Sequence, residues 1–164
     1  MPTTQNDLAT SSIPYPYLPE GRTFQYVPLS NPYMSEAKKI KEAHTSGSAA
    51  VVVRDGVILG KGSNRSPLYF PKLISLHNKY VCLRRWLRVP TGTQYWVCPG
   101  CSGYNQHSEA RAVRDAIRRS GSIAGADMYF YGHWWCCQPC WDKMIAAGIR
   151  NVYLVEGATQ LFKR

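Results

Sequence analysis

Four residues between positions 107 and 140 have the types and spacing of a hydrolytic zinc site. His107 and Glu109 form an H-x-E sequence, and Cys137 and Cys140 form a C-x-x-C pair further along the chain. One imidazole and two thiolates are three of the four ligands of a tetrahedral zinc ion, which leaves the fourth position for water, as in catalytic sites. We predict that His107, Cys137 and Cys140 bind Zn²⁺ and that Glu109 carries protons without binding the metal.

Two neighbouring thiols compete for the first cysteine position, because residue 136 is also a cysteine. The spacing favours Cys137. Its two-residue gap to Cys140 lets the backbone amides turn around one metal ion, whereas Cys136 would need a wider gap.

The chain contains six cysteines, and a second C-x-x-C pair lies at Cys98 and Cys101. Metal binding explains this spacing better than disulfides do in an intracellular protein. We expect a second, structural metal site formed by Cys82, Cys98 and Cys101, with His77 or another nearby histidine as the fourth ligand. Buried free thiols are one alternative. In another, the two C-x-x-C pairs share one structural zinc ion and Glu109 is an ordinary carboxylate at a helix start, which leaves the H-x-E spacing unexplained.

Length and composition predict one folded domain. A chain of 164 residues with 45% hydrophobic residues can bury a single core. We expect an extended, proline- and tyrosine-rich arm over residues 1–31 and one catalytic domain over residues 32–164. The sequence has no apolar run near the roughly 20 residues of a membrane span, and its start lacks the order of a secretory signal. We therefore expect a cytoplasmic protein without membrane partners.

The charge distribution predicts an anionic partner. The net charge is +10, and positions 56–108 contain no acidic residue. We expect the basic residues of this stretch to form a wall that faces phosphate groups; the alternative is a solvated face balanced by carboxylates from elsewhere in the fold. These seven residues are Lys61, Arg65, Lys72, Lys79, Arg84, Arg85 and Arg88.

The hydrophobic pattern predicts the elements that position the zinc ligands. Asn31 and Pro32 begin a helix over 32–44, and Asp55-Gly56 joins two strands at 49–54 and 57–60 into a hairpin. A long insertion at 68–106 contains a helix within 73–87. The remaining elements are a helix from His107 to before Gly121, a strand at 128–131, a helix at 137–147 and a strand at 151–155. The order predicts a mixed sheet with helices on its faces.

His107 and Cys137 then lie where the chain enters a helix. Exposed amide groups and partial positive charge at helix N-termini favour thiolates over thiols, as zinc binding also does. The ligand types and their expected location therefore agree.

The sequence resembles the cytidine and deoxycytidylate deaminase superfamily, in particular its dCMP deaminase branch. H-x-E followed by P-C-x-x-C is the signature of zinc nucleobase deaminases. The likeness extends over about residues 48–156 and includes the insertion. It is carried there by C-L-R-R at 82–85, P-T-G-T-Q-Y at 90–95 and Cys98, and after the second cysteine pair by K-M-I at 143–145 and A-G-I at 147–149.

This resemblance implies a three-layer α/β/α cytidine-deaminase-like fold with a central mixed sheet and helices on both faces. It also implies a homo-oligomer, zinc bound by the histidine and cysteine pair named above, Glu109 as the catalytic acid and base, and Asn64 in contact with the sugar or base. The chain departs from the family at two positions: it has Arg111 where the family usually has asparagine, and Cys136 where the family usually has proline. The loop at 132–135 is also longer than usual.

We expect the reaction to be hydrolysis of dCMP to dUMP and ammonia. Asn64 and Arg65 are the candidate sugar and phosphate contacts, and Arg111, Trp134 and Trp135 are expected to border the pocket. Each tryptophan could instead fill the core. The alternative substrate is cytosine or adenine in single-stranded DNA or RNA, because the excess of basic and aromatic residues would suit a strand. A third, non-enzymatic reading is a basic zinc module that only binds nucleic acid.

Overall fold

The structure is a computed structural model that describes residues 16–44, 46–90 and 92–163. Within these residues the chain forms one five-stranded sheet in the order β1-β5-β4-β2-β3. β2 is antiparallel to β3 and β4, whereas β5 is parallel to β4 and β1, so the sheet is mixed. The strands are β1 (Phe24–Val27), β2 (Ala49–Arg54), β3 (Val57–Ser63), β4 (Asp127–Tyr131) and β5 (Val152–Val155).

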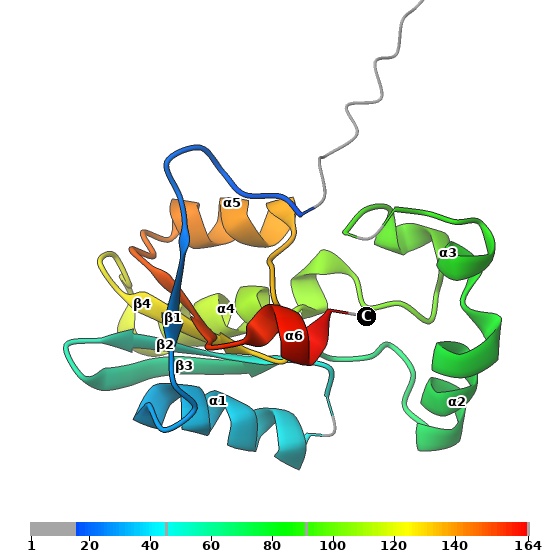
Figure 1. Ribbon diagram of the computed structural model, residues 1–164, viewed down its shortest axis with the longest axis horizontal. Coiled ribbons are helices and arrows are strands. Elements are labelled where there is room, and N and C mark those ends of the chain that lie inside the picture. The colour runs from blue at the N-terminus through cyan, green and yellow to red at the C-terminus, as the bar shows by residue number, and fades with distance from the viewer. Residues whose placement is uncertain (1–15, 45, 91, 164) are drawn as a thin grey trace, which may run out of the picture.

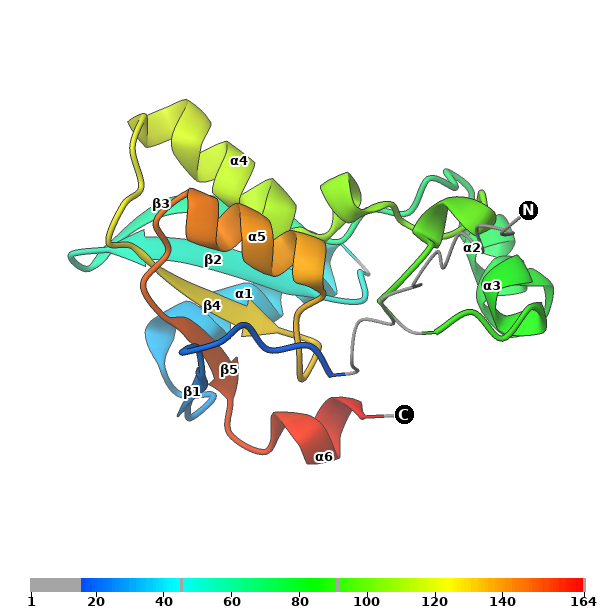
Figure 2. The same cartoon turned by 90° about the horizontal axis from the view of Figure 1, so that it is seen from above.

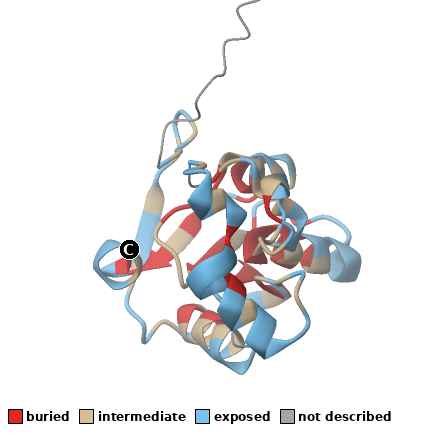
Figure 3. Ribbon diagram, turned by 90° about the vertical axis from the view of Figure 1, so that its right-hand side faces the viewer, coloured by how far each residue is buried: buried red, intermediate tan, exposed pale blue. Residues whose placement is uncertain are grey.

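Helices cover both faces of this sheet. α1 (Pro32–Ala43) lies on one face, and α4 (Ser108–Ser120) and α5 (Gln138–Ala146) lie on the other (Figures 1 and 2). A short helix, α6 (Ala158–Phe162), follows β5. Buried residues gather in the sheet and on the inner sides of the helices (Figure 3). The predicted three-layer α/β/α fold is confirmed.

Local sequence signals set the first helix and the hairpin. The Asn31 side chain accepts hydrogen bonds from the amides of Tyr33 and Met34 and so caps α1. Asp55 and Gly56 have φ values of 52° and 80° between β2 and β3. Positive φ at both central residues is the requirement of a type I′ hairpin turn, which an Asp-Gly pair meets at little strain.

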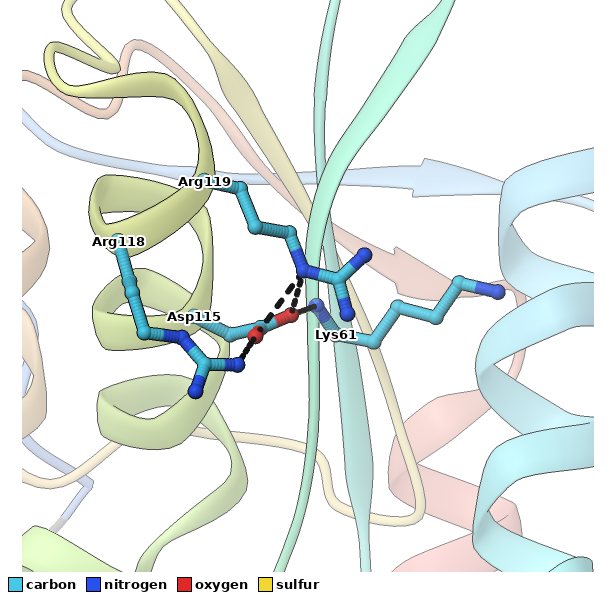
Figure 4. Close-up of polar contacts among 4 residues, drawn as sticks. All are labelled: Lys61, Asp115, Arg118 and Arg119. Carbon is cyan, nitrogen blue, oxygen red and sulfur yellow. Dashed lines mark hydrogen bonds and ion pairs between the residues drawn. The ribbon is translucent and has the colours of Figure 1, made fainter.

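Close packing between α4 and the edge strand β3 fixes the helix that carries Glu109. Gly62 is required by this contact, because a Cβ atom there would lie 2.4 Å from the carbonyl oxygen of Ser108. Asp115 of α4 accepts a hydrogen bond of 3.0 Å from the amide of Lys61, and Arg118 and Arg119 pair with the same carboxylate (Figure 4). The carboxylate thus satisfies an amide of the sheet edge.

The sequence reading did not anticipate β1. It lies within the stretch treated as an extended arm, where residues 24–27 pair in parallel with β5. The Arg22 guanidinium adds hydrogen bonds to the carbonyl groups of Ile149 and Arg150. Residues 16–31 therefore belong partly to the sheet, and the first 15 residues of the expected arm lie outside the described part.

The insertion projects from one end of the layered body (Figures 1 and 2). It consists of α2 (Pro71–Leu76), a π-helical turn η1 (His77–Val81) and α3 (Leu83–Trp86), followed by the 3₁₀ turns η2 (Tyr95–Val97) and η3 (Tyr104–Gln106). Among the described residues, no helix is both long and apolar enough to cross a membrane.

Candidate active site and second metal cluster

Two helix N-termini bring three metal-binding side chains together. His107 is the N-cap residue of α4, and Cys137 is the N-cap residue of α5. His107 Nδ1 lies 3.5 Å from the sulfur of Cys137 and 3.5 Å from that of Cys140. Two ligands at the usual Zn–N and Zn–S bond lengths around a tetrahedral ion are about 3.6 Å apart. The donor set and its spacing therefore fit a zinc ion with one open position.

The thiols of this cluster are coupled. A hydrogen bond from the Cys140 thiol lowers the pKa of Cys137 to about 6 and raises that of Cys140. Burial opposes the charged form of His107, but its contact with the Cys137 sulfur gives a net rise of the histidine pKa. Burial raises the pKa of the fully enclosed Cys136 thiol well above its usual value. Cys136 lies outside the group of converging ligand atoms, as its spacing predicted.

Glu109 lies beside these ligands in the first turn of α4. Its side chain is only 4% exposed. Ser108 donates a hydrogen bond of 3.0 Å to Oε2 of Glu109, and the hydroxyl of Ser48 lies 2.8 Å from that of Ser108. Glu109 is not part of the group of metal-ligand atoms, as the sequence predicted.

The active-site side chains line a cleft of about 1130 Å³. Glu109, Asn64, Arg65, Arg111 and Trp135 all border it. Asn64 offers a buried side-chain oxygen to which no described group donates a hydrogen bond. Arg111 donates to the carbonyl oxygen of Ser63 at 2.9 Å, which ties it to the end of β3.

The two tryptophans before the second cysteine pair have different positions. Trp135 is 5% exposed and forms part of the cleft wall. Trp134 is half-buried, and the Lys163 ammonium lies 5.4 Å from the centre of its ring. The structure therefore brings Trp135, and not Trp134, to the described cleft.

Two cleft residues were absent from the predicted site. His133 stacks on Phe130 with ring centres 6.4 Å apart, and burial lowers the pKa of its imidazole. Its Nδ1 accepts a hydrogen bond from the Trp134 amide. Tyr95 meets His107 edge to face at 4.8 Å. A histidine just before the second cysteine pair was a usable signal, but nothing local to Tyr95 indicated a contact with the metal ligand.

The chain matches a family model described as "Cytidine and deoxycytidylate deaminase zinc-binding region" over residues 29–156. The chain belongs to this family. It is therefore a zinc-dependent deaminase, a hydrolase with the α/β fold described above, and Zn²⁺ is its cofactor. No curated protein sequence matches the chain.

Several solved structures resemble this deaminase. The dCMP deaminase of cyanophage S-TIM5 in complex with dCMP and dUMP is 20% identical, with 78% of this chain and 82% of that chain covered and a TM-score of 0.47. The guanine deaminase of Bacillus subtilis is 16% identical, with 79% and 66% covered and a TM-score of 0.45. The family assignment rests on the sequence match alone.

The insertion of this deaminase gathers a second set of metal-binding groups. The ligand atoms of His77, Cys82, Cys98 and Cys101 all lie within 4.8 Å of one another. His77 Nε2 lies 3.2 Å from the Cys98 sulfur and 3.7 Å from the Cys101 sulfur, and the sulfurs of Cys82 and Cys101 are 3.6 Å apart. These separations fit four ligands around one tetrahedral ion, which are about 3.6 to 3.8 Å apart for zinc.

Neighbouring groups orient this second cluster. Asn78 Oδ1 lies 3.1 Å from His77 Nδ1, so Nε2 faces the sulfurs. Although burial opposes it, hydrogen bonds from the Gly100 amide and the His77 ring lower the pKa of Cys98 to about 6. Gly100 is required here, because a Cβ atom would lie 2.3 Å from the His77 ring.

The two cysteine pairs serve different clusters, so the alternative in which they share one four-cysteine site is wrong. Cys98 and Cys101 converge with a histidine of η1, whereas Cys137 and Cys140 converge with the histidine that precedes α4. α4 and β4 lie between the two pairs in the chain, and each pair has its own histidine.

Four of the seven residues of the expected basic wall line the cleft, namely Lys61, Arg65, Arg84 and Arg85, and three of them also bind groups of the chain itself. Lys61 forms an ion pair of 2.7 Å with Glu36 of α1. Arg84 donates to the carbonyl groups of Pro90 and Thr93, and Arg85 donates to that of His77. These contacts stabilise the fold. For Lys61, the alternative of a charge balanced by a carboxylate from elsewhere in the fold holds, because Glu36 is its partner.

Proposed function

We propose that this deaminase hydrolyses the exocyclic amino group of a cytosine mononucleotide, converting dCMP to dUMP and ammonia. The observation that carries this proposal is the buried Glu109 carboxyl group beside the three converging zinc ligands at the floor of a cleft. One side of that cleft offers the groups of Asn64, Arg65 and Arg111, which suit a sugar and a phosphate.

The proposed chemistry assigns one role to each group. Zinc bound by His107, Cys137 and Cys140 supplies a Lewis acid that lowers the pKa of a coordinated water molecule. Glu109 takes up a proton from the attacking water and delivers it to N3 of the ring, and a second transfer goes to the departing amine. The C4–O bond forms and the C4–N bond breaks. One proton of the water stays on N3 of the product, and the other leaves with the amino group as ammonia. Burial of Glu109 keeps competing solvent from the transfer.

The proposed substrate contacts follow from the cleft wall. The unpartnered oxygen of Asn64 can accept a hydrogen bond from a sugar hydroxyl or from the base. Arg65 is exposed at the cleft and can pair with the 5′-phosphate. Arg111 is already held by the carbonyl group of Ser63, so it presents a fixed positive charge. Trp135 provides an aromatic wall beside the base.

The internal pairing of basic side chains supports a mononucleotide over a strand. A strand would engage many phosphates, whereas one phosphate needs only two or three basic groups. Lys61 already forms an ion pair with Glu36 of α1. On α4, Arg118 and Arg119 pair with Asp115.

Exposed aromatic side chains of the insertion favour the second candidate, deamination of cytosine or adenine in single-stranded DNA or RNA. Tyr69 is 84% exposed and borders the cleft, and Trp96 is 82% exposed. Exposed rings of this kind stack on bases without sequence preference. A non-enzymatic nucleic-acid module would use the same surface without turnover.

An ammonia-release assay across dCMP, CMP, deoxycytidine, cytosine and single-stranded DNA and RNA separates these candidates. We expect dCMP to be converted fastest, with a shallow dependence on salt, since affinity for a strand falls by about one power of salt concentration per phosphate contact. If dCMP is inert at millimolar concentration while a strand is converted, the mononucleotide proposal fails. If nothing is converted but the strand binds, the deaminase has lost its activity and the binding reading holds.

We also propose that His77, Cys82, Cys98 and Cys101 bind a second, structural zinc ion. Four protein ligands leave no open position, which is typical of structural sites. The site closes the insertion, because Cys82 directly precedes α3 and the Cys98 amide donates to the carbonyl group of Tyr95. Tyr95 contacts the catalytic ligand His107, so a closed insertion also supports the cleft wall.

Elemental analysis of fully loaded protein tests this second site. We expect two zinc ions per chain, and one after Cys101→Ser. Cys136→Ala is the matched control, since Cys136 is a buried cysteine outside both ligand groups, and it should keep two ions. A wild-type value of one zinc ion per chain would mean that the four groups of the insertion are free side chains.

The assembly and compartment follow from the same features. We propose at least a dimer, because large apolar side chains of the insertion, including Tyr69, Trp86 and Trp96, are exposed on the single chain. A monomer in light scattering at working concentrations would refute this. A cytoplasmic location is proposed because thiolate zinc sites persist where cysteines are kept reduced.

A further inference from the structure

Two buried hydroxyl groups connect the Glu109 carboxyl group to the start of β2. Ser108 Oγ donates to Glu109 Oε2 at 3.0 Å, and Ser48 Oγ lies 2.8 Å from Ser108 Oγ. A serine hydroxyl has one proton, and that of Ser108 points to the carboxylate, so Ser48 is the donor to Ser108. The hydrogen bonds therefore run in one direction, from Ser48 through Ser108 to Glu109.

The three residues joined by these hydrogen bonds are buried, so the loss of either bond should be costly. Ser108 is 0% exposed, Glu109 4% and Ser48 8%. Water has little access to replace a lost partner, and hydrogen bonds to a charged group in such surroundings are the stronger ones. Successive bonds also polarise one another, which strengthens the bond that reaches the carboxylate.

The three residues come from elements that the fold holds firmly. Ser108 and Glu109 are the first two residues of α4, and the carbonyl of Ser108 packs against Gly62 of β3. Ser48 directly precedes the buried strand β2, and its carbonyl oxygen accepts hydrogen bonds from the Asn64 amide and the Ser46 hydroxyl. The two hydroxyl groups thus anchor the carboxylate to the backbone at the start of α4 and at the start of β2.

We propose that Ser108 and Ser48 are positioning residues for deamination: they hold Oε2 of Glu109, so that the carboxyl group keeps one orientation while it transfers protons. This inference rests on the proposed function, in which Glu109 is the proton carrier. Both residues act through hydrogen bonds of the structure, from Ser48 to Ser108 and from Ser108 to Oε2 of Glu109.

Steady-state kinetics with dCMP, or with whichever substrate of the panel is converted, test the proposal. Ser108→Ala should lower kcat about 10- to 100-fold, the loss expected from one hydrogen bond to a charged group. KM and zinc content should stay at the wild-type values, because neither residue is a metal ligand or a proposed substrate contact. Ser48→Ala should lower kcat less, since the bond to Glu109 remains.

The double variant gives the sharpest readout. Because Ser48 acts only through Ser108, adding Ser48→Ala to Ser108→Ala should change kcat no further. Ser122→Ala, which removes an exposed hydroxyl in the turn after α4, is the control and should match the wild type. If Ser108→Ala does not fold, a lowered kcat with unchanged KM in Ser48→Ala alone supports the proposal.

Three results would overturn the proposal. They are an unchanged kcat in folded, zinc-loaded Ser108→Ala, a KM effect without a kcat effect, and additive losses in the double variant. A wild-type protein that converts no substrate of the panel refutes the proposed function instead, so the two failures are distinguishable.

Discussion

The rings of Tyr95 and His107 meet edge to face with their centres 4.8 Å apart. Tyr95 belongs to the insertion. The Arg84 guanidinium lies 4.1 Å from the centre of the Tyr95 ring. The same arginine binds the carbonyl oxygen of Thr93. The insertion therefore supports His107, the proposed zinc ligand, through an aromatic contact that sequence spacing does not reveal.

Tyr95→Ala should weaken zinc binding at the catalytic site by about tenfold, because groups that orient a metal ligand typically affect affinity to that degree. Tyr95→Phe keeps the ring and should bind zinc as the wild type does. A chelator competition titration measures both variants. Equal losses in the two would assign the effect to the hydroxyl group and not to the ring.

The choice between adjacent thiols can be tested by zinc content. Cys137→Ala should lose the catalytic zinc ion, since its sulfur faces His107 at 3.5 Å. Cys136→Ala should keep it, because burial holds the pKa of the Cys136 thiol well above its usual value and its sulfur lies outside the ligand group. Loss of zinc in Cys136→Ala together with retention in Cys137→Ala would reverse the assignment.

Asp115→Asn should lower the free energy of unfolding by about 1–2 kcal/mol at neutral pH, since it weakens hydrogen bonds to one amide and two largely exposed arginines. Burial opposes the charged form of Asp115, but the Lys61 amide, Arg118 and Arg119 lower its pKa below the usual 3.8. A lowered pKa stabilises the fold above the unfolded-state pKa, and this contribution disappears as the pH falls through the folded-state value.

Urea unfolding at neutral pH and below pH ~4 checks this sign. The difference between the wild type and Asp115→Asn should shrink on acidification. Asp142→Asn, at an exposed carboxylate of α5, is the control and should change stability little at either pH. A difference that grows in acid would contradict the assignment.

Much of the fold was predictable because its signals are local. The cap at Asn31, the Asp55-Gly56 turn and the cysteine spacings each act over a few residues, and the structure has the expected helix, hairpin and ligand groups there. The mixed sheet followed from the order of elements. The family model matches residues 29–156, which agrees with the resemblance that the sequence motifs indicated.

The remaining features depend on contacts between distant residues. β1 gains its place from β5, more than 120 residues later in the chain, and its own sequence beside prolines predicts only an extended segment. Trp134 lies beside Lys163, a residue near the C-terminal end of the chain. The sequence predicted that Lys61 faces phosphate groups. Its ion pair with Glu36 was not foreseen, because Glu36 lies on a different element, α1.

The central claim is that Glu109 moves protons while His107, Cys137 and Cys140 hold zinc. Measuring zinc content and turnover together in Glu109→Gln tests it most directly. The variant should fold and keep the wild-type amount of zinc while losing activity by on the order of 10²-fold or more, the loss expected when a general acid and base is removed. Loss of zinc in a folded Glu109→Gln protein, or wild-type turnover with zinc retained, would contradict the account.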